Sequence, residues 1–312
     1  MLLTGRGTCT ALKRGPMRSP RSAAILFSTL LLASLPLDAP SAQNAPTVSA
    51  TAQAEIGRVR EATRRLTSID TARASGFEPR LGWFPTMGVH WVSEVRMNAG
   101  RAVKLSEPAH LMFSPIAGKD SLVGAAYAYF APLTDSTRPP TFDGNPPWHD
   151  HPNLAPEGHT LAMLHVWFVP SPDGPFAGHN PNLPFWALGL RPPDPARMRD
   201  PAADTRIRKT ALALGTLVDT VGLFPNVARR EPMRTLLAAM RDSIRPLTAE
   251  LDVAQKTGDW ARWDRAANRA AAYWDKIHDG YLAAAPNPQR RERMGAFMAE
   301  MATGAHGGGH KH

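Results

Sequence analysis

Residues 142–182 constrain the fold of this chain more than any other segment. They hold five of the eleven histidines, two of the eight tryptophans and the strongest strand pattern of the sequence, residues 160–169. Gly158 and Pro170 bound this run of aliphatic and aromatic residues, as expected for a strand that is buried on at least one face. A buried strand needs hydrogen-bonding partners, so the chain must contain further strands that pair with it.

Three shorter segments have the composition of strands and precede it in the chain: residues 88–97, 109–113 and 122–130. Before them, apolar residues recur at steps of three and four, which predicts an amphipathic helix over residues 53–75. Strands that are separated by Pro- and Gly-rich loops, after a single helix, are typical of an α+β domain around an antiparallel sheet. We assign this domain to residues 53–190.

The rest of the chain has the periodicity of helices. Residues 191–200 form a Pro-rich linker, and apolar residues then follow helical spacing through residues 201–303. Short turns between these helices predict an antiparallel bundle, so the α+β domain is followed by a C-terminal helical domain. Its tryptophan stripe and its methionine face are interpreted as core packing rather than as a cofactor site. Residues 304–312 are rich in Gly and His and predict a flexible tail.

The N-terminus has the pattern of a secretory signal peptide over residues 1–45. Arg18 and Arg21 precede the apolar run 23–37, and small residues follow at the expected cleavage region. The run is too short for a comfortable membrane span. We therefore expect an exported protein, periplasmic or extracellular, rather than an integral membrane protein.

Removal of this segment changes the chemistry that the chain can support. It lowers the formal net charge from +9 to +5 and removes Cys9, the one cysteine. The exported chain then has no disulfide, no thiolate metal ligand and no cysteine nucleophile. It has no basic cluster of the kind that binds nucleic acid, and none of the motifs of serine hydrolases, nucleotide-binding loops or zinc proteases.

Several segments resemble an uncharacterised family of secreted bacterial proteins. The similar segments are EATRRLTSIDTARASGFEP, PTMGVHWVS, LMFSP, LVGAAYAYF and LHVWFVPSPDGPFAGHNPNLP, which lie within residues 55–185. The family has a leading helix, a methionine-glycine-x-histidine-aromatic motif, a hydrophobic strand pair, and a leucine-histidine-valine-tryptophan motif before an asparagine-proline turn. The resemblance implies export and a compact domain, and it supplies no established activity.

The histidines of the family motifs correspond to His90 and His165. This chain departs from the family pattern at Ser114, where a glutamate is usual, and at Leu161, where a second histidine is common. It also lacks the cysteines that are common before the glycine-histidine motif. The resemblance therefore implies an altered site, in which the histidines within residues 149–159 compensate for the missing groups.

His149 and His151 lie two residues apart, so in an extended segment their rings face the same way, with Cα atoms about 6.6 Å apart. That spacing suits two ligands of one metal ion. We expect His165 and His90, from other strands, to complete the site. Neutral imidazoles bind Zn, Cu, Ni and Fe(II) well, and we expect copper or zinc here. His159 cannot share an ion with His165, because six residues of regular strand span about 20 Å. The expected partner is a metal ion or a small molecule, and the expected function is metal binding or handling.

Two other interpretations stay open. The segment from His149 to His179 has some similarity to the cupin arrangement of two histidines, a glutamate and a later histidine. That arrangement would give a metalloenzyme with an open site, in which Glu157 or Asp150 is a ligand or a base. Alternatively, the protein is a structural or ligand-binding envelope protein without metal, and every histidine is satisfied within the fold. The sequence alone does not decide whether the protein is an enzyme.

Overall fold

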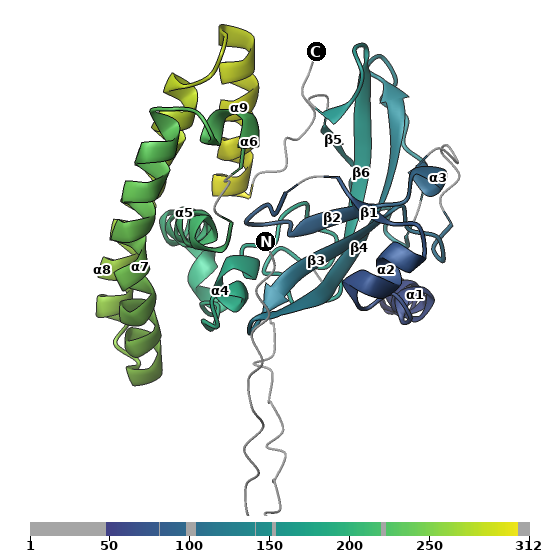
Figure 1. Ribbon diagram of the computed structural model, residues 1–312. Coiled ribbons are helices and arrows are strands. Elements are labelled where there is room, and N and C mark those ends of the chain that lie inside the picture. The colour runs from purple at the N-terminus through teal and green to yellow at the C-terminus, as the bar shows by residue number, and fades with distance from the viewer. Residues whose placement is uncertain are drawn as a thin grey trace, which may run out of the picture. The chain divides into compact units, whose positions relative to one another are not determined.

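The computed structural model describes residues 48–80, 82–97, 104–140, 142–151, 154–219 and 223–304. They belong to one compact unit, residues 42–312. The predicted signal peptide and residues 305–312 of the predicted tail lie outside the described residues. Within the described ranges, no helix combines the length and the apolarity that a membrane crossing requires. The predicted α+β class is confirmed, because an antiparallel sheet is followed by a set of helices (Figure 1).

A six-stranded sheet forms the first part of this unit. Its strands are β1 (Glu78–Pro79), β2 (Val89–Val92), β3 (His110–Ile116), β4 (Lys119–Pro132), β5 (His149–His151) and β6 (His159–Trp167). They lie in the order β1-β2-β3-β4-β6-β5, and each neighbouring pair is antiparallel. Because side chains alternate along each strand, the sheet has two distinct faces. The strands predicted at residues 109–113, 122–130 and 160–169 correspond to β3, β4 and β6.

The strand predicted over residues 88–97 is correct only in its first half. β2 ends at Val92, and Glu94–Met97 form a single helical turn, α3. Val95 is 83% exposed, whereas Met97 is 8% exposed. Residues two apart share a face in a strand but point in nearly opposite directions in a helix, so only the helical turn gives these two side chains different environments.

Two helices, α1 (Ala50–Thr63) and α2 (Ile69–Ala74), cover one face of the sheet. The sequence predicted one helix over residues 53–75, and this helix is divided in two. The hydroxyl of Ser68 accepts a hydrogen bond from the backbone N–H of Thr71, and the hydroxyl of Thr71 accepts one from the N–H of Ser68. This capping box begins a new helix with a different direction, which apolar periodicity alone does not reveal.

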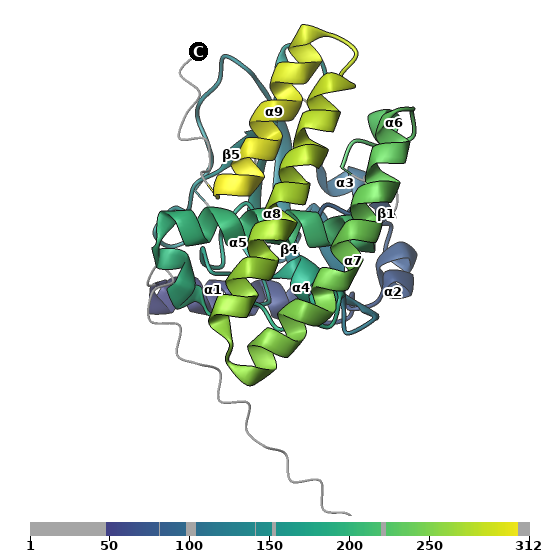
Figure 2. The same cartoon turned by 90° about the vertical axis from the view of Figure 1, so that its left-hand side faces the viewer.

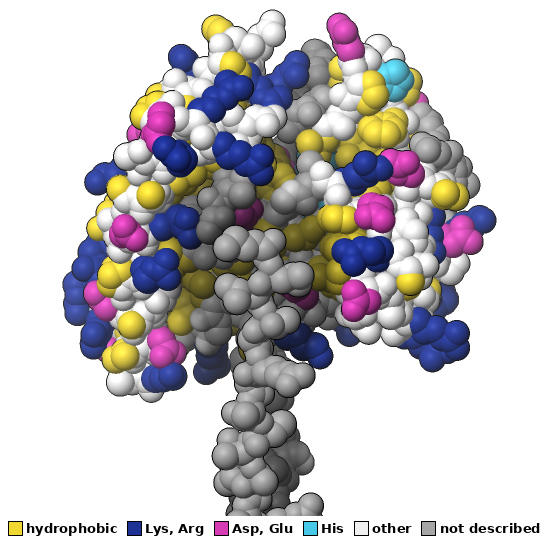
Figure 3. All heavy atoms as spheres, viewed as in Figure 1, with side chains coloured by type: hydrophobic (Ala, Val, Ile, Leu, Met, Phe, Trp, Pro, Cys, Tyr) yellow, Lys and Arg dark blue, Asp and Glu magenta, His cyan; other side chains and the backbone are white. Residues whose placement is uncertain are grey.

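Helices form the second part of the unit: α4 (Leu183–Ala187), η2 (Pro195–Arg199), α5 (Pro201–Val218), α6 (Pro225–Ala228), α7 (Met233–Thr257), α8 (Trp260–Ala283) and α9 (Pro288–Thr303). Figure 2 shows α7 and α8 as an antiparallel hairpin, which turns at Gly258 with φ 71°. α8 also packs against α5 and α9, so the predicted C-terminal bundle is confirmed. Lys and Arg side chains are spread over the visible face of both parts rather than gathered in one patch (Figure 3).

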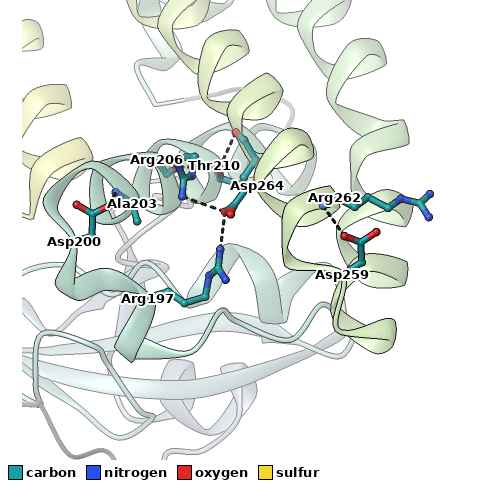
Figure 4. Close-up of polar contacts among 9 residues, drawn as sticks. Arg197, Asp200, Ala203, Arg206, Thr210, Asp259, Arg262 and Asp264 are labelled. Atoms are coloured by element: carbon teal, nitrogen blue, oxygen red, sulfur yellow. Dashed lines mark hydrogen bonds and ion pairs between the residues drawn. The ribbon is translucent and has the colours of Figure 1, made fainter.

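Large side chains fill the core of the helical part. Five of them are at most 2% exposed: Trp263, Trp274, Met294, Met298 and Met301. The tryptophan stripe and the methionine face are therefore packing surfaces. At the edge of this core, the carboxylate of Asp264 accepts hydrogen bonds from Arg197 at 2.6 Å and from Arg206 at 3.1 Å (Figure 4). These bonds join η2 and α5 to α8.

Candidate functional site

Five histidines lie on the sheet face opposite α1 and α2, and we call them the histidine cluster: His90, His110, His149, His151 and His165. Strand register places them there. His110 and His165 both pair with Ala126 of β4, and His151 pairs with Leu161, four residues before His165. Since alternate residues share a face, the cluster members point to the same side of the sheet.

Small residues on β4 allow these side chains to converge. Gly124, Ala126 and Ala128 occupy the cluster face of this strand, between β3 and β6. Two strands separate β2 from β6, so the backbones at His90 and His165 would lie about 14 Å apart in a flat sheet. Their Nε2 atoms are only 3.3 Å apart. The sheet therefore curves around this face, with the small side chains of β4 on the inside of the curve.

His165 is held in one tautomer. Its Nδ1 lies 2.8 Å from the carbonyl oxygen of Gly178, and a carbonyl can only accept, so Nδ1 carries the hydrogen and Nε2 the lone pair. The ring of His149 lies 4.7 Å from that of His165 and 5.0 Å from that of His151, between centroids. The structure thus brings together His149, His151, His165 and His90, the four residues that the sequence proposed as metal ligands.

The sequence did not single out His110 as a site residue. Its ring packs edge-on against His90, with centroids 5.6 Å apart, and its Nε2 lies 3.1 Å from the sulfur of Met97. The residue stands in a predicted strand, but only the pairing of β2 with β3 brings it beside His90. A strand pattern does not specify this register, so the residue could not be assigned to the site.

His179 lies beside the cluster, in the segment between β6 and α4. Its Nδ1 is 2.9 Å from the hydroxyl of Thr86, and its Nε2 is 3.6 Å from the carboxylate of Glu300 on α9. This contact connects α9 to the segment between β6 and α4. The cupin-like pattern in the sequence includes His179, but it does not predict the contact with α9, which is far away in the chain.

Burial keeps four of the five cluster histidines uncharged at neutral pH. Loss of water, and to a smaller extent the nearby His151, lower the pKa of His90 to about 3. Burial also lowers the pKa of His151 to about 4, although the carboxylate of Glu300 opposes this. The pKa values of His110 and His165 lie well below 6.5, mainly because of burial. These four imidazoles are therefore neutral and each keeps one lone pair, which is the form that binds a metal ion.

A cavity of about 730 Å³ adjoins the cluster. His90, His110 and His151 form its buried side on the sheet, and residues of α6 and α9 form the wall that faces them. Methionine, phenylalanine, leucine and valine side chains from both parts of the unit form most of the remaining wall. Small-molecule sites have volumes of about 300–1,000 Å³ and walls that are mostly apolar, so this cavity has the size and character of one.

Three other candidate residues from the sequence analysis, His159, Glu157 and Asp150, lie away from the cluster. His159 is exposed, and its Nδ1 donates to the backbone carbonyl of Glu157 at 3.1 Å. Glu157 is itself exposed. Asp150 lies on the opposite face from the histidines on either side of it and pairs with Arg138 at 2.5 Å. The cupin-like alternative therefore has neither of its predicted carboxylates at the cluster.

Among the described residues, no three His, Cys, Asp or Glu side chains already stand as a set that could hold a metal ion. The cluster instead holds the Nε2 atoms of His90 and His165 in direct contact, with further imidazoles packed around this pair. A third donor would have to turn toward this pair for a metal site to form.

Comparisons of the chain with protein-family models, with curated proteins and with solved structures find no match. The resemblance to a family of secreted bacterial proteins stays a prediction, and so does export. Any functional proposal therefore rests on the geometry of the histidine cluster and its cavity.

Proposed function

We propose that the protein binds a transition metal ion, copper or zinc, through the histidine cluster, and that it acts in metal binding or handling. The observation that carries this proposal is the 3.3 Å distance between the Nε2 atoms of His90 and His165. Two imidazole nitrogens that bind one tetrahedral ion at about 2.0–2.1 Å also lie about 3.3 Å apart. The pair therefore has the spacing of two ligands of one ion.

The surroundings of His165 support this role. Histidines that bind metals usually donate their second ring N–H to a carbonyl or a carboxylate, which fixes the ring and leaves the other nitrogen for the ion. Nδ1–H of His165 makes such a bond to the carbonyl of Gly178. The lowered pKa values add to this, because metal binding at neutral pH would not have to compete with a second proton on these rings.

The remaining ligands would come from His149 and His151. Both rings lie next to the pair or next to each other, so a change of side-chain rotamer, without movement of the strands, would aim a nitrogen at the ion. The sulfur of Met97 contacts the neighbouring His110 and adds a soft donor near the site. Soft donors favour copper(I) over zinc.

Metal content of the full chain tests this proposal. The purified protein is offered copper(I) and zinc(II) separately, desalted and assayed by elemental analysis. We expect near-stoichiometric metal and a raised melting temperature, because an ion that binds only the folded chain stabilises it. The His90→Ala/His165→Ala variant should lose both effects.

Two control variants locate the binding site. One replaces the exposed His159 by alanine, and the other replaces the tail residues His306, His310 and His312 by alanine. Both should retain the metal. Loss of metal only in the tail variant would place binding outside the cluster, and absence of retained metal in all forms would overturn the proposal.

A further inference from the structure

The polar groups that line the cavity are of two kinds, buried histidines and exposed side chains, and Arg80, Glu94 and Asn226 are among the exposed ones. One end of the cavity is the buried side formed by the histidines. The other is the mouth, where Arg290 and Arg293 of α9 are exposed to solvent and also line the cavity. Between the two ends the wall is mostly apolar. A ligand that fits this distribution has an apolar body with a different polar group at each of its ends.

The mouth favours an anion. Arg290 and Arg293 lie three residues apart, so their side chains are neighbours on one face of α9. Neither guanidinium forms an ion pair with another residue of the described ranges, whereas Arg80, which also lines the cavity, pairs with Glu94. Paired guanidinium groups suit a carboxylate, which they bind by charge-assisted hydrogen bonds. Figure 3 shows Lys and Arg side chains next to hydrophobic ones along the crevice between the two parts.

The buried end favours a hydroxyl group. Nδ1 of His90 and Nδ1 of His110 have no hydrogen-bond partner among the described residues, and each has under 1 Å² of accessible surface, so the ring must turn toward the cavity before a ligand reaches this atom. The Nε2 atom of His90 faces the lone pair of His165, and that of His110 faces the sulfur of Met97, so in the neutral rings the Nδ1 atoms are acceptors. A hydroxyl can donate to such an atom, and it can also accept if a bound metal changes the tautomer.

We propose that this cavity binds a single-chain aliphatic carboxylate that carries a hydroxyl at its far end. The carboxylate lies at Arg290 and Arg293, the chain lies along the apolar wall, and the hydroxyl reaches His90 or His110. This proposal goes beyond metal binding and does not depend on it. All titrations are therefore made on protein that has been treated with a chelator, so that failure of the ligand proposal and failure of the metal proposal are distinguishable.

Three probes test the two ends of the ligand separately in isothermal titration with the full chain. ω-Hydroxylauric acid has both polar groups, lauric acid lacks the hydroxyl, and methyl laurate lacks the charge. We expect ω-hydroxylauric acid to bind about tenfold more tightly than lauric acid, because it satisfies a buried acceptor. Methyl laurate should bind about tenfold more weakly than lauric acid. Equal affinities of the three probes, or no saturable binding, would overturn the proposal.

A pair of charge variants tests the mouth. The double variant Arg290→Gln/Arg293→Gln should lower the affinity for lauric acid about tenfold and leave the affinity for methyl laurate unchanged. The matched control is Arg262→Gln/Arg265→Gln, which removes two exposed arginines with the same spacing from α8. This control should bind all three probes as the unchanged chain does. Equal weakening by both pairs would mean a general charge effect and would overturn the assignment of the carboxylate.

Two single variants, His90→Phe and His110→Phe, test the buried end. At least one of them should abolish the advantage of ω-hydroxylauric acid while leaving the affinity for lauric acid within about twofold. A thermal melt of each variant verifies that the fold is retained. If both variants fold and both keep the full advantage of the hydroxyl, the assignment of the buried end is wrong.

Discussion

The two faces of the sheet are built from alternate residues of the same strands, and they have become different environments. On the face that α1 and α2 cover, Leu111, Leu164 and Val166 are fully buried and pack against apolar side chains. On the other face, His165 is equally buried, but its neighbours are imidazoles and a cavity. These residues are buried on both faces, but only one of the faces is filled.

The difference shows that burial alone does not make a hydrophobic core. Tyr127 of β4 reaches into the packed face, whereas its neighbours on the strand, Ala126 and Ala128, leave space on the other. Small side chains at the centre of a curved sheet leave a hollow, and the polar residues around that hollow then lack the dense packing of an ordinary core. Such a hollow is an expensive feature for a fold to keep unless it binds something.

The largest expected difference between the two faces is their contribution to the pH dependence of stability. Below about pH 6.5 the histidines of the unfolded chain gain protons, while the buried ones stay neutral until the pH approaches their native pKa values, about 3 for His90 and about 4 for His151. The stability that these neutral histidines contribute is therefore fully present above pH 6.5. It is lost as the pH falls toward their native pKa values, because the unfolded chain binds more protons. We expect the free energy of unfolding of the metal-free protein to drop by on the order of 5 kcal/mol between pH 7 and pH 5. Urea titrations at several pH values measure it.

One variant assigns this acid effect to the cluster. His165→Phe removes one neutral imidazole and should reduce the drop by about 2 kcal/mol. His159→Gln, at the exposed start of the same strand, should leave the drop unchanged. A free energy of unfolding that does not change between pH 7 and pH 5 would contradict the neutral, buried state of the cluster.

Two leucines of β6 compare packing on the two faces directly. Leu164 is fully buried on the packed face, and Leu161 lines the cavity on the other. We expect Leu164→Ala to lower the free energy of unfolding by about 2–5 kcal/mol, because it leaves a new void in a filled core. Leu161→Ala should cost only about 1–2 kcal/mol, since one side of this residue already adjoins empty space. Equal losses would mean that the two faces are packed alike.

The smallest effect is expected at Asp150, which lies between His149 and His151 in the sequence but on the other face of the strand. Its pair with Arg138 is partly exposed, so Asp150→Asn should change stability by at most about 1 kcal/mol. Metal affinity should also stay the same, as measured by competition with a chelator. A large loss of affinity would instead place this carboxylate in the metal site and favour the cupin-like alternative.

The sequence already indicated the strands that matter and four of the histidines. Strand composition located β3, β4 and β6, and the spacing of His149 and His151 correctly placed both rings on one side. The strand pattern gave a wrong prediction for residues 94–97, where the chain leaves the strand and forms a helical turn. The helical turn α3 replaced the end of a predicted strand and brought Met97 to His110, a contact that no periodicity announces.

By itself, the sequence determined the alternation that puts polar and apolar residues on opposite faces, because side-chain direction in a strand follows from position along the chain. Only the tertiary structure decided that His90 meets His165 and that α9 lines the cavity which the histidines adjoin. Those contacts depend on strand order, on the curvature that Ala126 and its small neighbours permit, and on how the helices pack. Each of these arises from interactions between residues far apart in the chain, and local sequence patterns do not predict such interactions.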